Sequence, residues 1–68
     1  MYEIDNAKIL TLMDESGLKQ WRIADELGIH RRTLLRRMRT GDWTGRELAL
    51  LGALLQCDPG SFFKLNLP

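Results

Sequence analysis

The sequence contains little of what several classes of protein require. Its 68 residues include one cysteine and two prolines, and no apolar run is longer than a few residues. The single Cys57 cannot form an internal disulfide and fits a reducing compartment. A membrane-spanning helix needs about 20 apolar residues, and a signal peptide needs a basic segment followed by an apolar one. The chain has neither pattern, so we expect a cytoplasmic protein with no membrane partner.

Patterns of enzyme chemistry are also missing. No nucleophile has a nearby base, no glycine-rich loop could cradle phosphate, and no cluster of Cys, His and carboxylates has metal-ligand spacing. The adjacent carboxylates at 14–15 and 25–26 fall on outward faces of expected helices, which is usual for solvated side chains. We therefore expect a protein that is not an enzyme and takes no metal, cofactor or small-molecule substrate.

Length and composition allow one small domain. A chain this short buries only about 60% of the surface that its unfolded form exposes, so its margin of stability is small. The apolar content of 44% is ordinary for a folded protein. We expect an all-α fold, a compact bundle of about five short helices that spans residues 1–64, followed by a short tail at 65–68.

Helical spacing of apolar residues and helix-ending glycines locate the five helices. The first is expected at 6–16, with Asp5 or Asn6 as its cap and Gly17 at its end. The others are expected at about 20–27, 31–39, 45–56 and 59–64, after a short lead-in at residues 1–4. The apolar stripe of the first helix consists of Ile9, Leu10, Leu12 and Met13.

Two capping signals define the C-terminal half of the chain. Thr44 and Glu47 have the spacing of a capping box, and Trp43 precedes them as a core residue that packs back on the helix. Asp58 before Pro59 starts the last helix. The residues expected to be buried here are Leu48, Leu51, Leu54, Leu55, Cys57, Phe62 and Phe63.

The stretch from Gln20 to Arg39 organises the chain. Gly28 lies between Leu27 and Ile29, and glycine accepts a left-handed turn without steric cost. A helix before this glycine and a helix after it would therefore be joined by a tight turn. The sequence predicts a helix-turn-helix at 20–39.

The second helix of this pair carries most of the basic charge. Residues 30–39 hold five arginines and one histidine without an acid, although the net charge of the chain is only +1. Leu34, Leu35 and Met38 are expected to hold the helix to the body. The side chains expected to point away from the body are those of Arg32, Thr33, Arg36 and Arg39. Arginine can donate two parallel hydrogen bonds to guanine, each good pair giving about 1–3 kcal/mol of discrimination. This placement favours entry into the DNA major groove over a merely solvated face.

Individual roles follow from position along the helix. N-terminal residues of such helices reach the bases, so the base-contact candidates are Arg31, Arg32 and Arg36, and the phosphate candidates are Arg37 and Arg39. His30 is expected near the DNA backbone, or else is a simple cap or surface residue. Trp21 either packs on the domain surface, which we favour, or flanks a backbone contact. The full set of expected DNA-binding residues is Gln20, Trp21, His30, Arg31, Arg32, Thr33, Arg36, Arg37 and Arg39.

Several of these residues form a pattern that extends over most of the chain. The pattern consists of Gln20, Ile23, Ala24, Leu27, Gly28, Ile29, Thr33 and Leu34, then the segment 43–48 and the ending D-P-G-S-F-F at 58–63. Over residues 6–64 it resembles the Cro- and repressor-type helix-turn-helix family of phages and bacteria, the XRE class, with its lambda-repressor-like fold. That family usually has an apolar residue at the place of Arg37, and here Met38 is expected to pack one residue later.

The resemblance implies a repressor or transcriptional switch that binds a two-fold double-stranded DNA operator as a homodimer, in the cytoplasm and nucleoid of a bacterial host cell. It also implies that Gln20 holds a phosphate or supports a recognition side chain. The residues at 31–34 also resemble the helix-turn-helix of Fis-like proteins.

Other functions could use the same surface. One is a protein-interaction module that docks on an acidic partner, and another is a recombination or excision accessory factor that binds DNA. The apolar Leu65 and Leu67 in the tail are the candidate seam of the homodimer, unless the tail is simply frayed.

Overall fold

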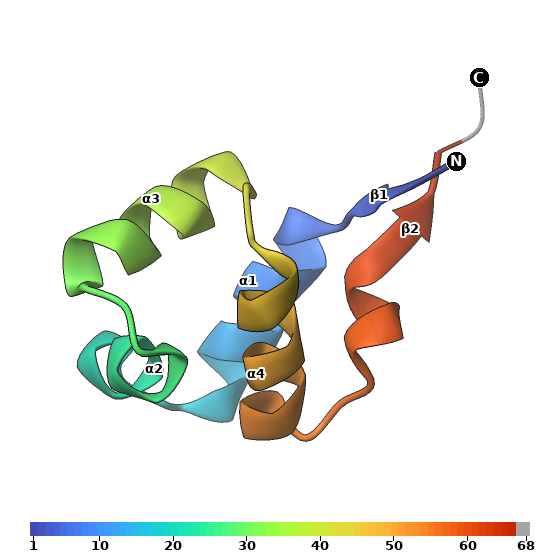
Figure 1. The fold of residues 1–68 in the computed structure, drawn as a ribbon. Coiled ribbons are helices and arrows are strands. Elements are labelled where there is room, and N and C mark those ends of the chain that lie inside the picture. The colour runs from blue at the N-terminus through green and yellow to red at the C-terminus, as the bar shows by residue number, and fades with distance from the viewer. Residues whose placement is uncertain (67–68) are drawn as a thin grey trace.

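The computed structural model describes residues 1–66 and has four α-helices with a two-stranded sheet at the chain ends (Figure 1). The elements are β1 (Tyr2–Ile4), α1 (Asn6–Ser16), α2 (Gln20–Leu27), α3 (Arg31–Thr40), α4 (Gly45–Leu55), the 3-10 helix η1 (Pro59–Phe62) and β2 (Phe63–Leu65). The first four predicted helices are confirmed to within one residue at each end. The compact, mainly helical architecture is therefore confirmed.

The all-α prediction was wrong at the chain ends. β1 and β2 pair antiparallel with Tyr2 opposite Leu65, Glu3 opposite Lys64 and Ile4 opposite Phe63. The lead-in is thus a strand, and the helix predicted at 59–64 is one 3-10 turn followed by a strand. Residue 65, which was predicted to lie in a tail, is part of β2, and residues 67–68 lie outside the described part of the chain.

Every helix contributes side chains to one core. Its ten buried apolar residues are Ile9, Met13, Ile23, Ala24, Leu27, Leu34, Trp43, Leu48, Leu51 and Phe62. Cys57, Leu54 and Leu55 were predicted as buried and are half-buried. Leu35 and Phe63 were also predicted to pack inward, but both are exposed. Phe63 leaves the core because the chain turns into β2 directly after Phe62.

The N-terminal end of α1 is tied to the region around Trp43. The indole Nε1–H of Trp43 donates a hydrogen bond of 2.8 Å to Asn6 Oδ1, and Asn6 Nδ2 donates one of 2.9 Å to the Met38 carbonyl. The predicted core position of Trp43 is confirmed. Asn6 therefore links the start of α1 directly to α3 and also to the buried indole that follows α3.

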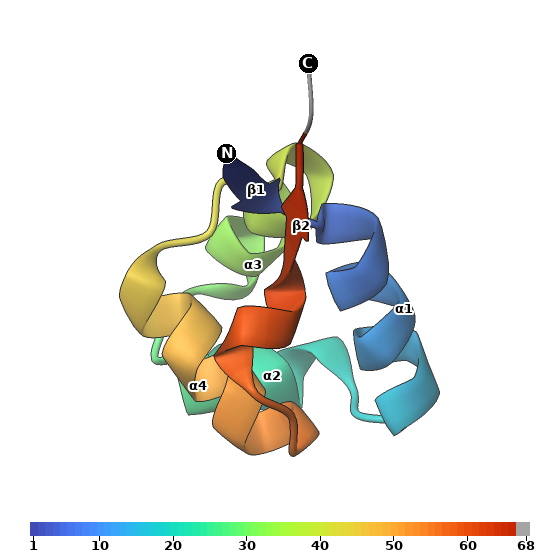
Figure 2. The same ribbon diagram turned by 90° about the vertical axis from the view of Figure 1, so that its right-hand side faces the viewer.

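Gly52 allows η1 to fold back on α4. A Cβ atom at this position would lie 2.7 Å from Pro59 Cγ and 2.9 Å from the Cys57 carbonyl oxygen. Only glycine leaves room for this approach. Figure 2 shows η1 and β2 running between α1 and α4, which is the path that brings Phe62 into the core.

Among residues 1–66, no helix is both long enough and apolar enough to cross a membrane.

Candidate nucleic-acid interface

The turn between α2 and α3 is fixed by backbone hydrogen bonds around Gly28. This glycine has φ +68°, in the left-handed region. Its N–H donates to the Asp25 carbonyl, and the N–H of Ile29 donates to the Ala24 carbonyl at 3.0 Å. These two bonds form a Schellman motif, which ends a helix and reverses the chain sharply. The glycine predicted to separate two helices does so here.

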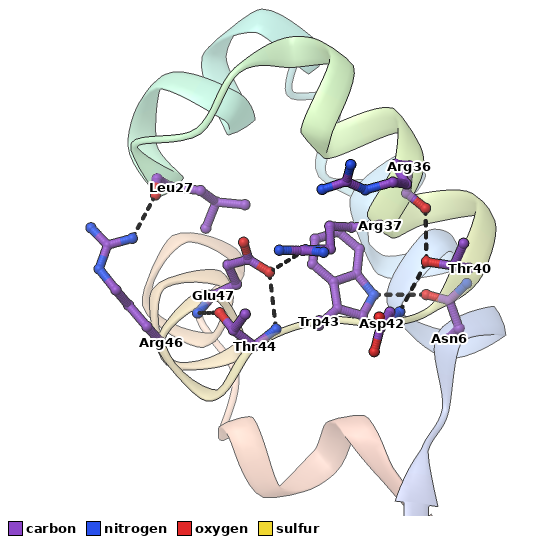
Figure 3. Close-up of polar contacts among 10 residues, drawn as sticks. All are labelled: Asn6, Leu27, Arg36, Arg37, Thr40, Asp42, Trp43, Thr44, Arg46 and Glu47. Atoms are coloured by element: carbon purple, nitrogen blue, oxygen red, sulfur yellow. Dashed lines mark hydrogen bonds and ion pairs between the residues drawn. The ribbon is translucent and has the colours of Figure 1, made fainter.

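The side chain of Arg46, at the start of α4, joins this turn to α4. Its Nη1 donates a 2.9 Å hydrogen bond to the Leu27 carbonyl, one of the acceptors that the end of α2 leaves free (Figure 3). A Cβ at Gly28 would lie 3.4 Å from Nη2 of the same side chain. Sequence reasoning did not find this contact because it joins residues 19 apart with no local signal.

α3 is held to the core by one fully buried residue. Leu34 has no exposed surface, and Met38, one turn later, is half-buried against the core. Because these two positions are four apart, they lie on the same face of the helix. The opposite face of α3 is therefore turned to solvent, and Figure 1 shows α3 at the side of the molecule away from β1 and β2.

Four arginines of α3 have exposed side chains: Arg31, Arg32, Arg36 and Arg39. Within residues 1–66, the ion pairs join Arg22 to Glu26, Arg37 to Glu47 and Lys64 to Glu3, so none of the four is neutralised by a carboxylate of the chain. We call these four residues the arginine face. It concentrates four positive charges on one helix of a chain whose net charge is +1.

Gln20 connects the first residue of α2 to the arginine face. Its side-chain oxygen Oε1 accepts a hydrogen bond of 3.3 Å from Arg31 Nη2. This contact orients one guanidinium group relative to α2. Both roles implied for Gln20, holding a phosphate and supporting a recognition side chain, stay predictions.

The remaining predicted site residues lie around the start of the two helices. His30 is the N-cap of α3, and its Nδ1 accepts a hydrogen bond of 3.4 Å from the Arg32 backbone N–H. Thr33 is half-buried at the edge of α3. Trp21, for which packing was favoured, is instead 63% exposed on α2. Its indole lies at the second position of α2, one residue after Gln20.

Arg37, which was predicted to contact a phosphate, differs from the four exposed arginines of α3 because a carboxylate of the chain binds it. Its Nε donates a 2.9 Å hydrogen bond to Glu47 Oε1, and its side chain is 18% exposed (Figure 3). It lies three residues after Leu34, so it shares the inward side of α3. The structure therefore gives Arg37 an intramolecular partner and removes it from the arginine face.

Glu47 combines this ion pair with the predicted capping box, which is confirmed. Its carboxylate accepts from the Thr44 backbone N–H at 3.0 Å, and its own N–H donates to Thr44 Oγ1 at 3.1 Å. Burial alone would raise the pKa of Glu47. The hydrogen bond from the Thr44 N–H, the hydrogen bond and charge of Arg37, and the Thr44 hydroxyl together outweigh burial and lower that pKa.

Leu35 was predicted to clamp α3 to the body, yet its side chain is 42% exposed. On a helical wheel it lies on the far side of Met38 from Leu34, next to the arginines at 31 and 39. The sequence shows only that Leu35 is at the edge of a three-residue stripe. Whether such a residue is buried depends on a neighbouring helix, whose position the sequence pattern does not give.

Comparison with known proteins found no relative of this chain. No protein-family model matches the chain, and neither a curated protein nor a solved structure resembles it at a significant level.

Proposed function

We propose that the chain is a sequence-specific, double-stranded DNA-binding transcriptional regulator of the Cro and repressor type. In this proposal residues 20–39 form the helix-turn-helix, and α3 enters the major groove. The observation that carries it is the arginine face, whose four guanidinium groups are exposed and have no carboxylate partner within residues 1–66. A rigid helix that presents unpaired guanidinium groups fits a polyanion with hydrogen-bond acceptors in its groove.

The roles of the arginines follow from their places on α3. Residues near the N-terminus of a recognition helix contact base edges, so we assign Arg31, Arg32 and Arg36 to bases. Arg39 is in the last turn and is assigned to a phosphate. Gln20 would hold Arg31 in its bidentate orientation through the hydrogen bond between their side chains.

The arginines assigned to bases should set sequence preference. Duplexes selected from a random pool would first define the bound sequence. Replacing Arg32 or Arg36 by alanine is then expected to lower the preference for this sequence over random DNA by about 5- to 150-fold, because one bidentate contact to guanine is lost. Fluorescence anisotropy titrations of the selected and random duplexes would measure the ratio.

The matched control removes a positive charge elsewhere. Lys64 is exposed on β2, so Lys64→Ala should leave the preference unchanged. Wild-type affinity should also fall steeply with salt, because each neutralised phosphate releases counterions. Equal wild-type affinity for every duplex would contradict the proposal. Retention of an acidic protein without any DNA binding would favour the interaction-module alternative.

We further propose that the operator is bound by a homodimer. A single module of this size buries roughly 600–1,000 Å² on DNA, and two copies on half-sites about one helical turn apart would strengthen binding. The β1–β2 pair offers the contact surface. Its four apolar residues Tyr2, Ile4, Phe63 and Leu65 share one face, because opposed residues in an antiparallel pair lie on the same side.

The outer end of this sheet face is uncovered. Tyr2 is 71% exposed and Leu65 is 52% exposed, whereas Ile4 at the inner end packs against the core. Figure 1 shows both strands extending away from the helices, so no other part of residues 1–66 covers their outer pair. The proposed surface keeps Leu65 from the predicted seam and adds Tyr2, whereas Leu67 lies outside the described residues.

Replacing Tyr2 and Leu65 together by serine should weaken self-association at least tenfold, because burying a leucine alone contributes about 1.5–3 kcal/mol. Sedimentation equilibrium of wild type and variant would give the dimer dissociation constants. Lys64→Ser is the control, since this residue lies on the opposite face of the same strand. A wild-type chain that stays monomeric both alone and on the selected duplex would refute the dimer.

A further inference from the structure

Leu35 is an apolar side chain set among the arginines of α3. Arg31 and Arg32 precede it by four and three residues, and Arg39 follows it by four. Residues at these spacings are neighbours on a helix surface. With 42% of its surface exposed, Leu35 is not part of the buried core. The surface that would face the groove is therefore basic with one hydrocarbon patch.

The base edges of the major groove offer one apolar group that such a patch fits. Guanine, cytosine and adenine present donors and acceptors there, and thymine adds its C5-methyl group. The arginines on either side of Leu35 are attracted to phosphates and guanine edges, which would bring the leucine against the floor of the groove. Charge complementarity thus selects duplex DNA as the occupant of this patch.

We propose that Leu35 contacts the C5-methyl group of a thymine next to the guanines bound by Arg32 and Arg36. This inference rests on the proposed function and specifies its ligand. Each half-site of the bound duplex would contain a thymine adjacent to guanine. Leu35 would then contribute to the choice of DNA sequence. This role differs from the predicted one, in which Leu35 packs α3 against the body.

The test replaces each thymine of the selected duplex, one at a time, by deoxyuridine, which lacks the methyl group. Wild-type affinity should fall about fourfold at one thymine of each half-site, which is the effect of losing one buried methyl-sized group. In Leu35→Ala the same deoxyuridine substitution should cause no further loss. Arg39→Ala is the control, because it should bind more weakly but keep the fourfold sensitivity.

Leu35→Gln provides a second variant with a side chain of similar length and no methyl groups. Circular dichroism should show both variants folded, as expected for a residue outside the core. Equal deoxyuridine sensitivity in wild type and both variants, or unfolding of both variants, would overturn the role of Leu35. If selective DNA binding persists in wild type, the proposed function would stand. A wild-type chain that selects no duplex would overturn the function and this inference together.

Discussion

Glu47→Ala is expected to lower the free energy of unfolding by about 3 kcal/mol. The Glu47 side chain is only 5% exposed, and its carboxylate accepts hydrogen bonds from Arg37 and from the Thr44 backbone. Removing this carboxylate leaves the guanidinium group of Arg37, whose side chain is 18% exposed, without a partner. It also removes the hydrogen bond by which Glu47 caps α4. Urea denaturation at neutral pH, followed by circular dichroism, would measure the change.

This contribution should also depend on pH. The folded state lowers the pKa of Glu47, so the stabilisation is fully present above the ordinary glutamate pKa, about 4.3. It is lost as the pH falls from there through the lower pKa of the folded state. The Glu47→Gln variant cannot titrate at this position, so its stability deficit relative to wild type should shrink over the same range.

A double-mutant cycle separates the ion pair from the cap. Arg37→Met and Glu47→Gln, alone and together, would give the coupling energy between the two side chains. Thr44→Ala removes the other half of the capping box and should be destabilising by about 1 kcal/mol. A loss below 0.5 kcal/mol for Glu47→Ala, the scale of ordinary surface substitutions, would contradict the structural role assigned to the pair.

For Arg37, the sequence could indicate the face of α3 but not the partner, Glu47. Position 37 lies three residues after a buried leucine, so helical spacing alone indicates that it is not on the outer face. Its partner could not be read from spacing, because the ion pair joins α3 to α4 and Glu47 already had a local explanation in the capping box. Arg32, Arg36 and Arg39 were predicted on the outer side and are exposed, because that inference needs only the period of one helix.

The helix bounds were predictable for a similar reason. Gly17, Gly28 and the capping box are local signals that act within a few residues. The strands have no such signal, since three residues are too few to show an alternating pattern. Their pairing joins residues more than 58 apart in sequence, because position 4 lies opposite position 63. Only the completed helical core brings the two chain ends together.

Leu34→Ala is expected to lower the free energy of unfolding by about 4 kcal/mol, more than Glu47→Ala. The reason is that truncating a fully buried leucine leaves a cavity. A chain of 68 residues has roughly 3–10 kcal/mol in total. The midpoint of thermal unfolding should therefore fall by about 15–30 °C, or the variant should be largely unfolded at 25 °C. Thermal denaturation followed by circular dichroism would measure this, with Leu35→Ala as the neighbouring control, expected to lose under 1 kcal/mol.

A comparison of Leu34→Ala with Arg36→Ala distinguishes support of α3 from contact with DNA. Leu34→Ala should weaken binding only through its unfolded fraction, so cooling or excess duplex should restore the folded population and the base preference. Arg36→Ala should remain folded and lose that preference at every temperature. If Leu34→Ala kept wild-type stability, or if its folded form bound without preference, then Leu34 would not be the residue that holds the arginine face in place.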